Sequence, residues 1–318
     1  MMRTKEQFLM LFVLGGMMLA GLAACSGDDD TATDGSAPQT ADDGVKMRRL
    51  TITEVEGDAA DAKQALTRAT LAEDDGELTA SWKTGDGLTY CNLMRTKHVM
   101  TPKEDDIPIS GNLKATTAAA ISQFTGDVEC KAGDYLAVVY PATTFETNER
   151  YTISLARQDG TLSGLATNYH YVFGKATVTK VTETTANATM GKMKSLLTVC
   201  KFSFKDKNTG DAIPIKSLSI SYSTGDSNNG KYPQSATVAI GVNTAQDDVH
   251  ATGADITAPL TITASGQTEV YVALLPTAAQ RTFNFTVTNA SGTYSGTAKA
   301  TLVEGEYVVA TGLKLTKL

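Results

Sequence analysis

The sequence has 318 residues, of which 42% are hydrophobic and 20% charged, and its formal net charge is −7. A chain of this length can form two ordinary domains with apolar cores, and an acidic balance without a basic stripe argues against a nucleic-acid partner. The low charged fraction and the abundance of Thr, Ser, Gly and Ala favour extracellular β-structure over a helical enzyme.

Residues 1–24 are expected to be a secretory signal. Arg3 and Lys5 precede a short apolar run that ends in small residues. The run falls short of the about 20 apolar residues that a membrane-spanning helix needs. Leu22-Ala23-Ala24-Cys25 resembles the lipobox of bacterial lipoproteins, in which the cysteine is lipidated. The alternative is an ordinary signal peptide followed by Cys25 by coincidence.

Residues 25–45 are expected to be a disordered acidic tether. Ser26–Gly44 contains six Asp and neither Lys nor Arg, and it has no large apolar residue with which to fold. Its start, Ser26–Asp30, resembles the acidic signal that sends lipoproteins of Bacteroides-type bacteria to the outer face of the outer membrane. A solvated linker would have the same composition, and the two interpretations are compatible.

Residues 46–185 are expected to form a first β-domain. In Lys46–Glu56, Leu50 and Ile52 alternate with Thr51 and Thr53, which is the pattern of a half-buried strand. Further strand-like segments follow between Gly- and Asp-rich turns. They are Leu78–Trp82, Leu88–Leu93, Ile121–Glu129, Tyr135–Tyr140, Tyr151–Leu155 and Tyr169–Val181. Thr116–Gln123 is the only helix candidate, and the domain boundary is placed in the polar stretch Thr182–Thr189.

Residues 186–318 are expected to form a second β-domain. Its strand-like segments are Leu197–Phe204, Leu218–Tyr222, Thr237–Val242, Leu260–Ala264, Val270–Leu275, Phe283–Val287 and Tyr294–Leu302. The last strand places five residues on one face: Tyr307, Val309, Thr311, Leu313 and Leu315. Short strands at this spacing predict an all-β protein with two tandem antiparallel β-sandwich domains.

Motifs for catalysis or metal binding are missing from the sequence. His98, His170 and His250 are isolated from one another, and no Gly-x-Ser-x-Gly or phosphate-binding loop occurs. The acidic clusters lack the order of a calcium loop and are expected to be solvated turns. We therefore expect no catalytic residue, no metal site, no cofactor and no enzymatic activity.

The cysteines leave their redox state open. With Cys25 lipidated, the odd number that remains, Cys91, Cys130 and Cys200, cannot all pair within one chain. One disulfide or three buried thiols would both satisfy the sequence, and no spacing fits a zinc site.

The order of features along the chain resembles the fimbrillin family, the type V pilins of Bacteroides-type bacteria. The resemblance rests on the lipobox at Cys25, on a first strand followed by Arg68-Ala69-Thr70-Leu71, and on two successive all-β halves. Gln123-Phe124-Thr125-Gly126 leading to Tyr135–Pro141 also resembles the N-terminal domain of that family. The resemblance to this family implies transthyretin-like, Greek-key sandwich domains and a role as a pilus subunit in cell adhesion.

The resemblance also implies how the protein is processed. The precursor would be anchored in the outer membrane by lipid, and an Arg-specific surface protease would cut between Arg68 and Ala69, removing residues 46–68. Another pilin subunit would fill the vacated groove with a strand, and the protein would end in the fimbria. A plain linker arginine is the alternative for Arg68.

Two questions stay open at the level of sequence. Stalk pilins of the family carry an appended donor strand, and this chain ends at Leu318 soon after its last strand, so a tip or accessory subunit is expected unless Tyr307–Leu318 itself donates. The adhesion ligand, on a host or bacterial surface, is not indicated. The main alternative is a glycan-binding surface lipoprotein of a nutrient-uptake system, which should expose several aromatic side chains. A surface hydrolase is the second alternative function.

Overall fold

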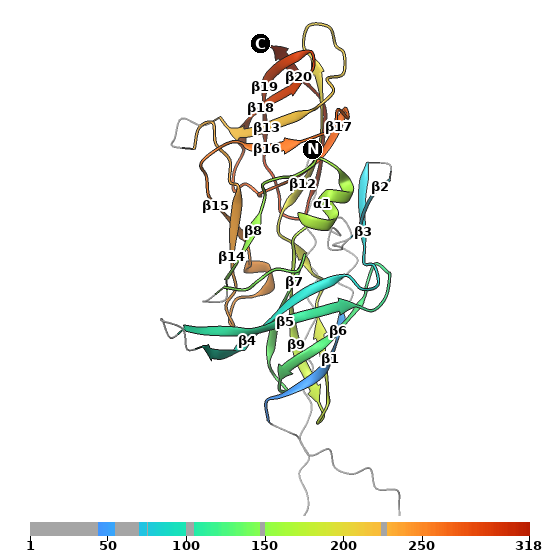
Figure 1. Ribbon diagram of the computed structural model, residues 1–318, viewed down its shortest axis with the longest axis vertical. Helices are drawn as coiled ribbons and strands as arrows, with labels where there is room; N and C mark the ends of the chain where they lie inside the picture. Colours follow the sequence, from blue (N-terminus) through green and yellow to red (C-terminus); the bar gives the residue numbers. More distant parts are fainter. Residues whose placement is uncertain (1–43, 55–69, 75, 100–104, 147–149, 224–227) are drawn as a thin grey trace, which may run out of the picture. The chain divides into compact units, whose positions relative to one another are not determined.

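The computed structural model describes residues 44–54, 70–74, 76–99, 105–146, 150–223 and 228–318 (Figure 1). Three residues singled out in the sequence, Cys25, Arg68 and Ala69, lie outside the described residues. Within the described part the protein is all-β, with two β-rich domains. No helix in these ranges is long and apolar enough to cross a membrane.

The first domain is built on a sheet with the strand order β10-β1-β6-β5-β4-β7-β9-β11. Its strands are β1 (Lys46–Glu54), β4 (Gly87–Val99), β5 (Asp105–Ala115), β6 (Gln123–Cys130), β7 (Tyr135–Tyr140), β9 (Val172–Val181), β10 (Thr185–Met190) and β11 (Lys194–Ser195). Because β10 also pairs with β9, the sheet closes into a barrel, and most of its pairs are antiparallel. The exception is β1 with β10, which run parallel.

The second domain is built on a sheet with the order β16-β13-β18-β19-β20-β12-β17. Its strands are β12 (Thr198–Asp206), β13 (Ser217–Tyr222), β16 (Leu260–Thr263), β17 (Glu269–Leu274), β18 (Arg281–Asn289), β19 (Gly292–Ala300) and β20 (Tyr307–Lys317). The two edge strands are bridged by one segment: the amide N–H of Thr263 on β16 donates to the Gln158 carbonyl, and that of Tyr271 on β17 donates to the Gly160 carbonyl. Gly160 has φ 73° there, a conformation that favours glycine.

Smaller elements join these sheets. A three-stranded sheet pairs β8 (Arg150–Ser154) with β14 (Ser235–Ala239), and β14 with β15 (Ala251–Ala254). The remaining elements are the hairpin β2 (Thr70–Asp74) and β3 (Glu77–Ser81), helix α1 (Leu162–Asn168) and the 3₁₀ turn η2 (Gln246–Asp248). Thr161 caps α1, because its hydroxyl accepts the amide N–H of Gly164 at 2.9 Å.

Two apolar clusters form the core. One fills the barrel and includes Leu50, Ile52 and Phe124. The other combines residues of the second sheet with residues of first-half strands, such as Cys91 on β4 and Tyr151 on β8. Since β8 pairs with β14 and contributes to this second cluster, residues on both sides of the expected domain boundary share one core.

Three local expectations differ from the structure. Thr116–Gln123 is not helical, and the α-helix lies instead at Leu162–Asn168. The polar stretch expected to separate the domains contains β10, whose buried residues include the small Ala186 and Ala188 and so give a weak apolar signal.

The face predicted for the last strand is the third difference. Val309 is 47% exposed, whereas Leu315 is 1% exposed. The register of β20 against β12 shifts near Gly312, which has φ 68°. The inward residues therefore have even numbers before the shift and odd numbers after it. Tyr307, Val309, Thr311, Leu313 and Leu315 therefore do not share one face.

Candidate strand-exchange site

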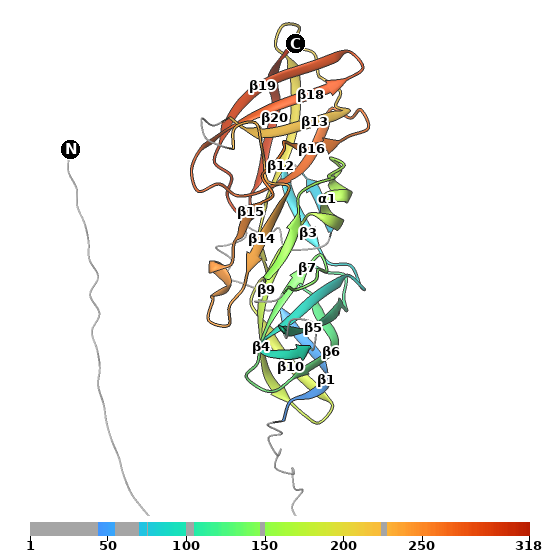
Figure 2. The same cartoon turned by 60° about the vertical axis from the view of Figure 1, so that its left-hand side comes forward.

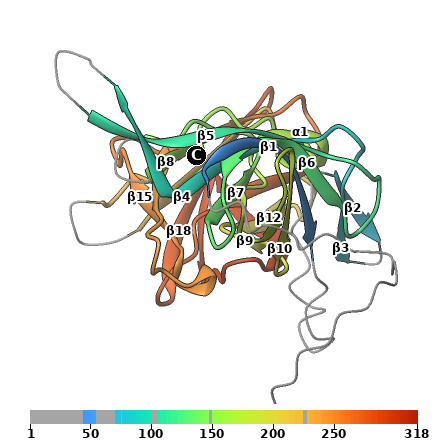
Figure 3. The same cartoon turned by 90° about the horizontal axis from the view of Figure 1, so that it is seen from below.

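The first strand, β1, is an inner strand of the barrel. It pairs antiparallel with β6 along Lys46–Thr53 and parallel with β10 along Arg49–Glu54. Figure 3 shows β1, in blue, running beside β6. Removing an inner strand would leave two rows of backbone groups without partners, and such rows readily bind an added strand.

Leu50 and Ile52 fasten β1 to the interior of the barrel. Both side chains are 0% exposed. Leu50 lies between Gly126 of β6 and Ala186 of β10, so small neighbours leave room for it. A Cβ on Gly126 would overlap the Asn112 carbonyl, which explains the glycine. Truncating buried side chains of this kind costs about 2–5 kcal/mol each.

Arg48 is a buried cation in the same strand, with 1% of its surface exposed. Its guanidinium donates from Nε to the Thr182 carbonyl at 2.6 Å and from Nη1 to the Gly44 carbonyl at 3.0 Å. It also donates to the carbonyl of Cys130, at the end of β6. Charge-assisted bonds to backbone carbonyls on both sides tie β1 to the segments that flank it.

The outward side of β1 contributes little to its retention. Met47 is 61% exposed. Lys46 pairs with Glu183 at 2.7 Å and Arg49 with Asp127 at 3.3 Å, in each case between well-exposed side chains. Exposed ion pairs contribute about 0–1 kcal/mol. Retention therefore depends on the backbone ladders, Arg48 and the two inward side chains.

Trp82, the only tryptophan of the chain, packs against a residue that is paired with β1. Its ring is 1% exposed and packs edge-on against Phe124, with centroids 5.0 Å apart. Phe124 is the register partner of Ile52. Loss of β1 would therefore expose the neighbourhood of Trp82 to water, which its fluorescence can report.

The hairpin of β2 and β3 is held by a charged cluster. The Glu73 carboxylate on β2 accepts from Lys201 Nζ at 3.0 Å, from the Tyr307 hydroxyl at 2.8 Å and from the Tyr271 hydroxyl. The Glu73 and Lys201 side chains are 17% and 14% exposed. The three donors belong to β12, β20 and β17, so β2 is fastened to the second sheet.

This cluster shifts the ionisation of its members. The Tyr271 hydrogen bond, aided by Lys201 and Tyr307, lowers the pKa of Glu73 although partial burial opposes the shift. The hydrogen bond to Glu73 raises the pKa of Lys201. The carboxylate and the ammonium are both favoured by folding, so the cluster stabilises the docked hairpin at neutral pH.

The three cysteines that follow the tether are buried, and none of them forms a disulfide. Burial raises the pKa of the Cys130 thiol to about 11 and also raises that of Cys200. Protonated, inaccessible thiols are poor nucleophiles and poor metal ligands. Of the two alternatives for Cys91, Cys130 and Cys200, the structure has the thiols.

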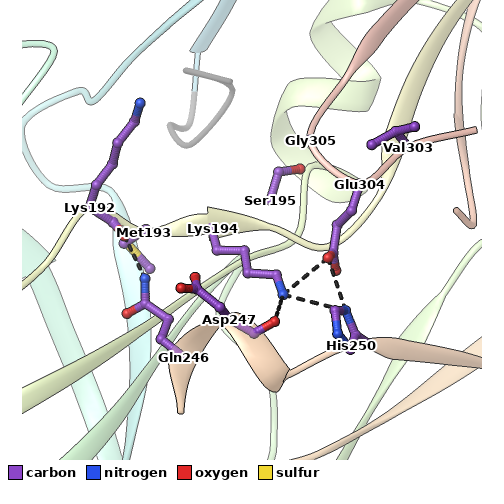
Figure 4. A pocket seen from close by; sticks show the side chains of 10 residues that line it. All are labelled: Lys192, Met193, Lys194, Ser195, Gln246, Asp247, His250, Val303, Glu304 and Gly305. Carbon is purple, nitrogen blue, oxygen red and sulfur yellow. Dashed lines mark hydrogen bonds and ion pairs between the residues drawn. The ribbon is translucent and has the colours of Figure 1, made fainter. Parts of the chain in front are cut away.

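A polar pocket of about 330 Å³ brings one of the isolated histidines next to charged residues (Figure 4). The Glu304 carboxylate lies 3.0 Å from both Lys194 Nζ and His250 Nδ1. Ser195 also lines the pocket, but it is 3% exposed and its hydroxyl donates to the Leu197 carbonyl at 3.2 Å. A hydroxyl turned away from the histidine does not make a nucleophile–base pair. Within the described ranges, no group of three His, Cys, Asp or Glu could hold a metal ion.

The sequence identified β1 as a candidate for strand exchange but did not indicate two other features of the site. Neither β10, which pairs with β1, nor the Glu73 cluster was expected, since the first has small buried residues and the second joins positions more than a hundred residues apart. Nor does the sequence indicate that Arg48 is buried.

Comparison with known proteins gives likenesses of low identity. No family model and no curated protein matches the chain. Among solved structures, a protein from Bacteroides uniformis ATCC 8492, described as a "putative cell adhesion protein", is 15% identical over 87% of this chain and 94% of its own, with a TM-score of 0.47. A protein of the same description from Bacteroides eggerthii DSM 20697 is 11% identical over 84% of this chain and 86% of its own, at 0.39.

The shaft pilin SpaA from Lactobacillus rhamnosus GG is 9% identical over 86% of this chain and 98% of its own, with a TM-score of 0.33. Identities and TM-scores of this size transfer no function. The function therefore has to be argued from this chain's own residues.

Proposed function

We propose that the protein is a fimbrillin-like pilus subunit that serves cell adhesion and assembles by strand exchange. The observation that carries the proposal is the position of β1, an inner strand that precedes Arg68 and is bound on both sides. In this proposal Cys25 anchors the precursor to the outer membrane by lipid. An Arg-specific protease then cuts after Arg68, and the protein passes into the fimbria.

The two sides of the proposed cut differ in a way that suits such processing. Before it lies β1, held by noncovalent contacts that a competing strand can replace one by one. After it lies β2, which the Glu73 cluster fastens to the second sheet. A cut at Arg68 would therefore free the first strand and leave the rest of the molecule intact.

A role as acceptor of a strand, at the tip or as an accessory subunit, fits better than a role as donor. The strand considered for donation, β20, is an inner strand that pairs with β12 at seven positions. Its first residue, Tyr307, also binds Glu73. Release of β20 would break these interactions and open the second core, whereas release of β1 opens only the barrel.

The rival glycan-binding lipoprotein was expected to expose several aromatic side chains. Among large apolar side chains of the described residues, those that are well exposed include one aromatic, Tyr135. A single ring is no platform for stacking sugars. This supports the pilus subunit over that rival.

The test is limited proteolysis of the purified lipid-free chain with an Arg-specific protease. We expect one early cut, after Arg68, seen by intact mass, followed by a red shift of Trp82 fluorescence when β1 leaves the barrel and before a partner strand takes its place. Self-assembly would be followed by light scattering. A clean cut without assembly would indicate a tip subunit that lacks its partner.

Two variants control this experiment. Arg68→Ala should resist the cut, whereas Arg157→Ala, which removes an exposed arginine at a left-handed turn position, should be cut like the parent. Resistance at Arg68 in the parent chain, or general degradation, would contradict the processing step.

A further inference from the structure

One surface of the second domain carries exposed lysines and no acidic residue of its own strands. Five neighbouring strands, β16, β13, β18, β19 and β20, contain no Asp or Glu, although the chain has 35 acidic residues. Figure 2 shows these strands side by side. Their outward residues, together with those at the end of β12, are called the hydroxyl face below.

The hydroxyl face carries transverse rows of hydrogen-bonding side chains. One row crosses five strands through successive register partners: Thr261, Ser219, Thr286, Ser295 and Thr316. The next row contains Asn284 and Thr297, whereas their neighbour Ser221 is 7% exposed and already accepts from the Asn284 amide at 3.5 Å. Partners on adjacent strands are about 5 Å apart, so the rows offer closely and regularly spaced donors and acceptors.

Lysines on this face have no acidic partner among the described residues. Lys205 on β12 is the register partner of Lys314 on β20, and both are exposed. Lys299 on β19 is exposed on the same face. Like charges directly opposite each other destabilise a sheet. An anion bound between them would relieve that repulsion.

Two carboxylates at the border of the face make other contacts. Asp206 accepts the amide N–H of Asn208 at 2.7 Å, in the turn that follows β12. Glu269 lies 3.2 Å from Lys201. Lys205, Lys299 and Lys314 are therefore available to a ligand.

We propose that the hydroxyl face binds an anionic polysaccharide. Sulfate or carboxylate groups would contact the lysines, while sugar hydroxyls would bond to the Ser, Thr and Asn rows. The outward residues of the face include no aromatic ring on which bases could stack, which favours a polysaccharide over single-stranded nucleic acid. This names a ligand class for the adhesion in the proposed function and rests on that function only for its biological role.

The experiment measures binding of the purified full chain to immobilised heparin, with neutral dextran and duplex DNA as comparisons. K205E/K299E/K314E should weaken heparin binding roughly tenfold or more, because three favourable contacts become repulsive. The matched variant K83E/K114E/K180E makes the same charge change at three exposed lysines of the other sheet and its turns, and it should bind like the parent. Thermal melts would verify that both variants fold.

A second variant separates binding through the hydroxyl groups from general electrostatic attraction to the lysines. T286V/S295A keeps every charge and removes two hydroxyls of the row, so it should weaken heparin binding about threefold and leave duplex DNA binding unchanged. The proposal is overturned if the parent does not bind heparin at physiological salt. It is overturned too if both lysine variants weaken binding equally, or if DNA binds as tightly and T286V/S295A has no effect. Since binding needs no cut, the proteolysis result stays independent of each outcome.

Discussion

At the scale of single residues, the hold on β1 is concentrated in a few side chains. Arg48 is buried and donates to carbonyls on both sides of the strand, while its neighbour Arg49 points outward to Asp127. Adjacent arginines thus have opposite surroundings, because successive side chains of a strand point to opposite faces.

This contrast gives a prediction. Arg48→Met should lower the free energy of unfolding by about 2–4 kcal/mol, because it leaves buried carbonyls without their charged donor. Arg49→Met, the matched control, should change it by about 0.5 kcal/mol or less. Urea unfolding of both variants measures the difference, and equal effects would refute the role given to Arg48.

At the scale of elements, β1 behaves as a replaceable strand held by ladders and two inward side chains. Leu50 and Ile52 are its deepest residues, and Met47 is its most exposed large one. After a cut, retention of β1 should depend on the inward pair and not on the outward residue.

The corresponding prediction concerns the cut protein. L50A/I52A should release the first-strand fragment far faster than the parent, since the two truncations together cost about 4–10 kcal/mol of packing. Met47→Ala should release it at the parental rate. Gel filtration of cut protein, with Trp82 fluorescence in parallel, measures the rate. A fast release from the Met47 variant would contradict the assigned faces.

At the scale of the whole molecule, the Glu73 cluster joins the hairpin of β2 and β3 to the second sheet. The folded state lowers the pKa of Glu73 below its ordinary 4.5. A group whose pKa is lowered on folding stabilises the protein above its unfolded pKa, and that contribution disappears as the pH falls through the folded pKa.

Glu73→Gln should therefore be less stable than the parent at pH 7, and the difference should shrink once the pH falls below about 4.5. Glu77→Gln, on the exposed side of the same hairpin, should differ little from the parent at any pH. Thermal unfolding between pH 3 and pH 7 measures both, with the pH range set around the ordinary pKa of Glu. A difference between Glu73→Gln and the parent that does not change with pH would contradict the ionised cluster.

The sequence was sufficient for features that depend on local pattern. Alternation at Leu50 and Ile52 identified the first strand, and the spacing of the later apolar segments predicted an all-β chain with two β-rich domains. It was insufficient for β10, whose buried alanines resemble a polar linker, and for β20, where a shift at Gly312 changes the inward face.

By itself, then, the sequence determined the class of fold, the first strand and the acidic character of the chain, because periodicity and composition are local properties. Only the tertiary structure decided that β1 lies between β6 and β10, that Arg48 is buried, and that Glu73 meets Lys201, Tyr271 and Tyr307. It alone aligned the hydroxyl rows and placed Lys205 opposite Lys314. These contacts join distant positions, and strand pairing between distant segments depends on burying the whole core together rather than on any one segment.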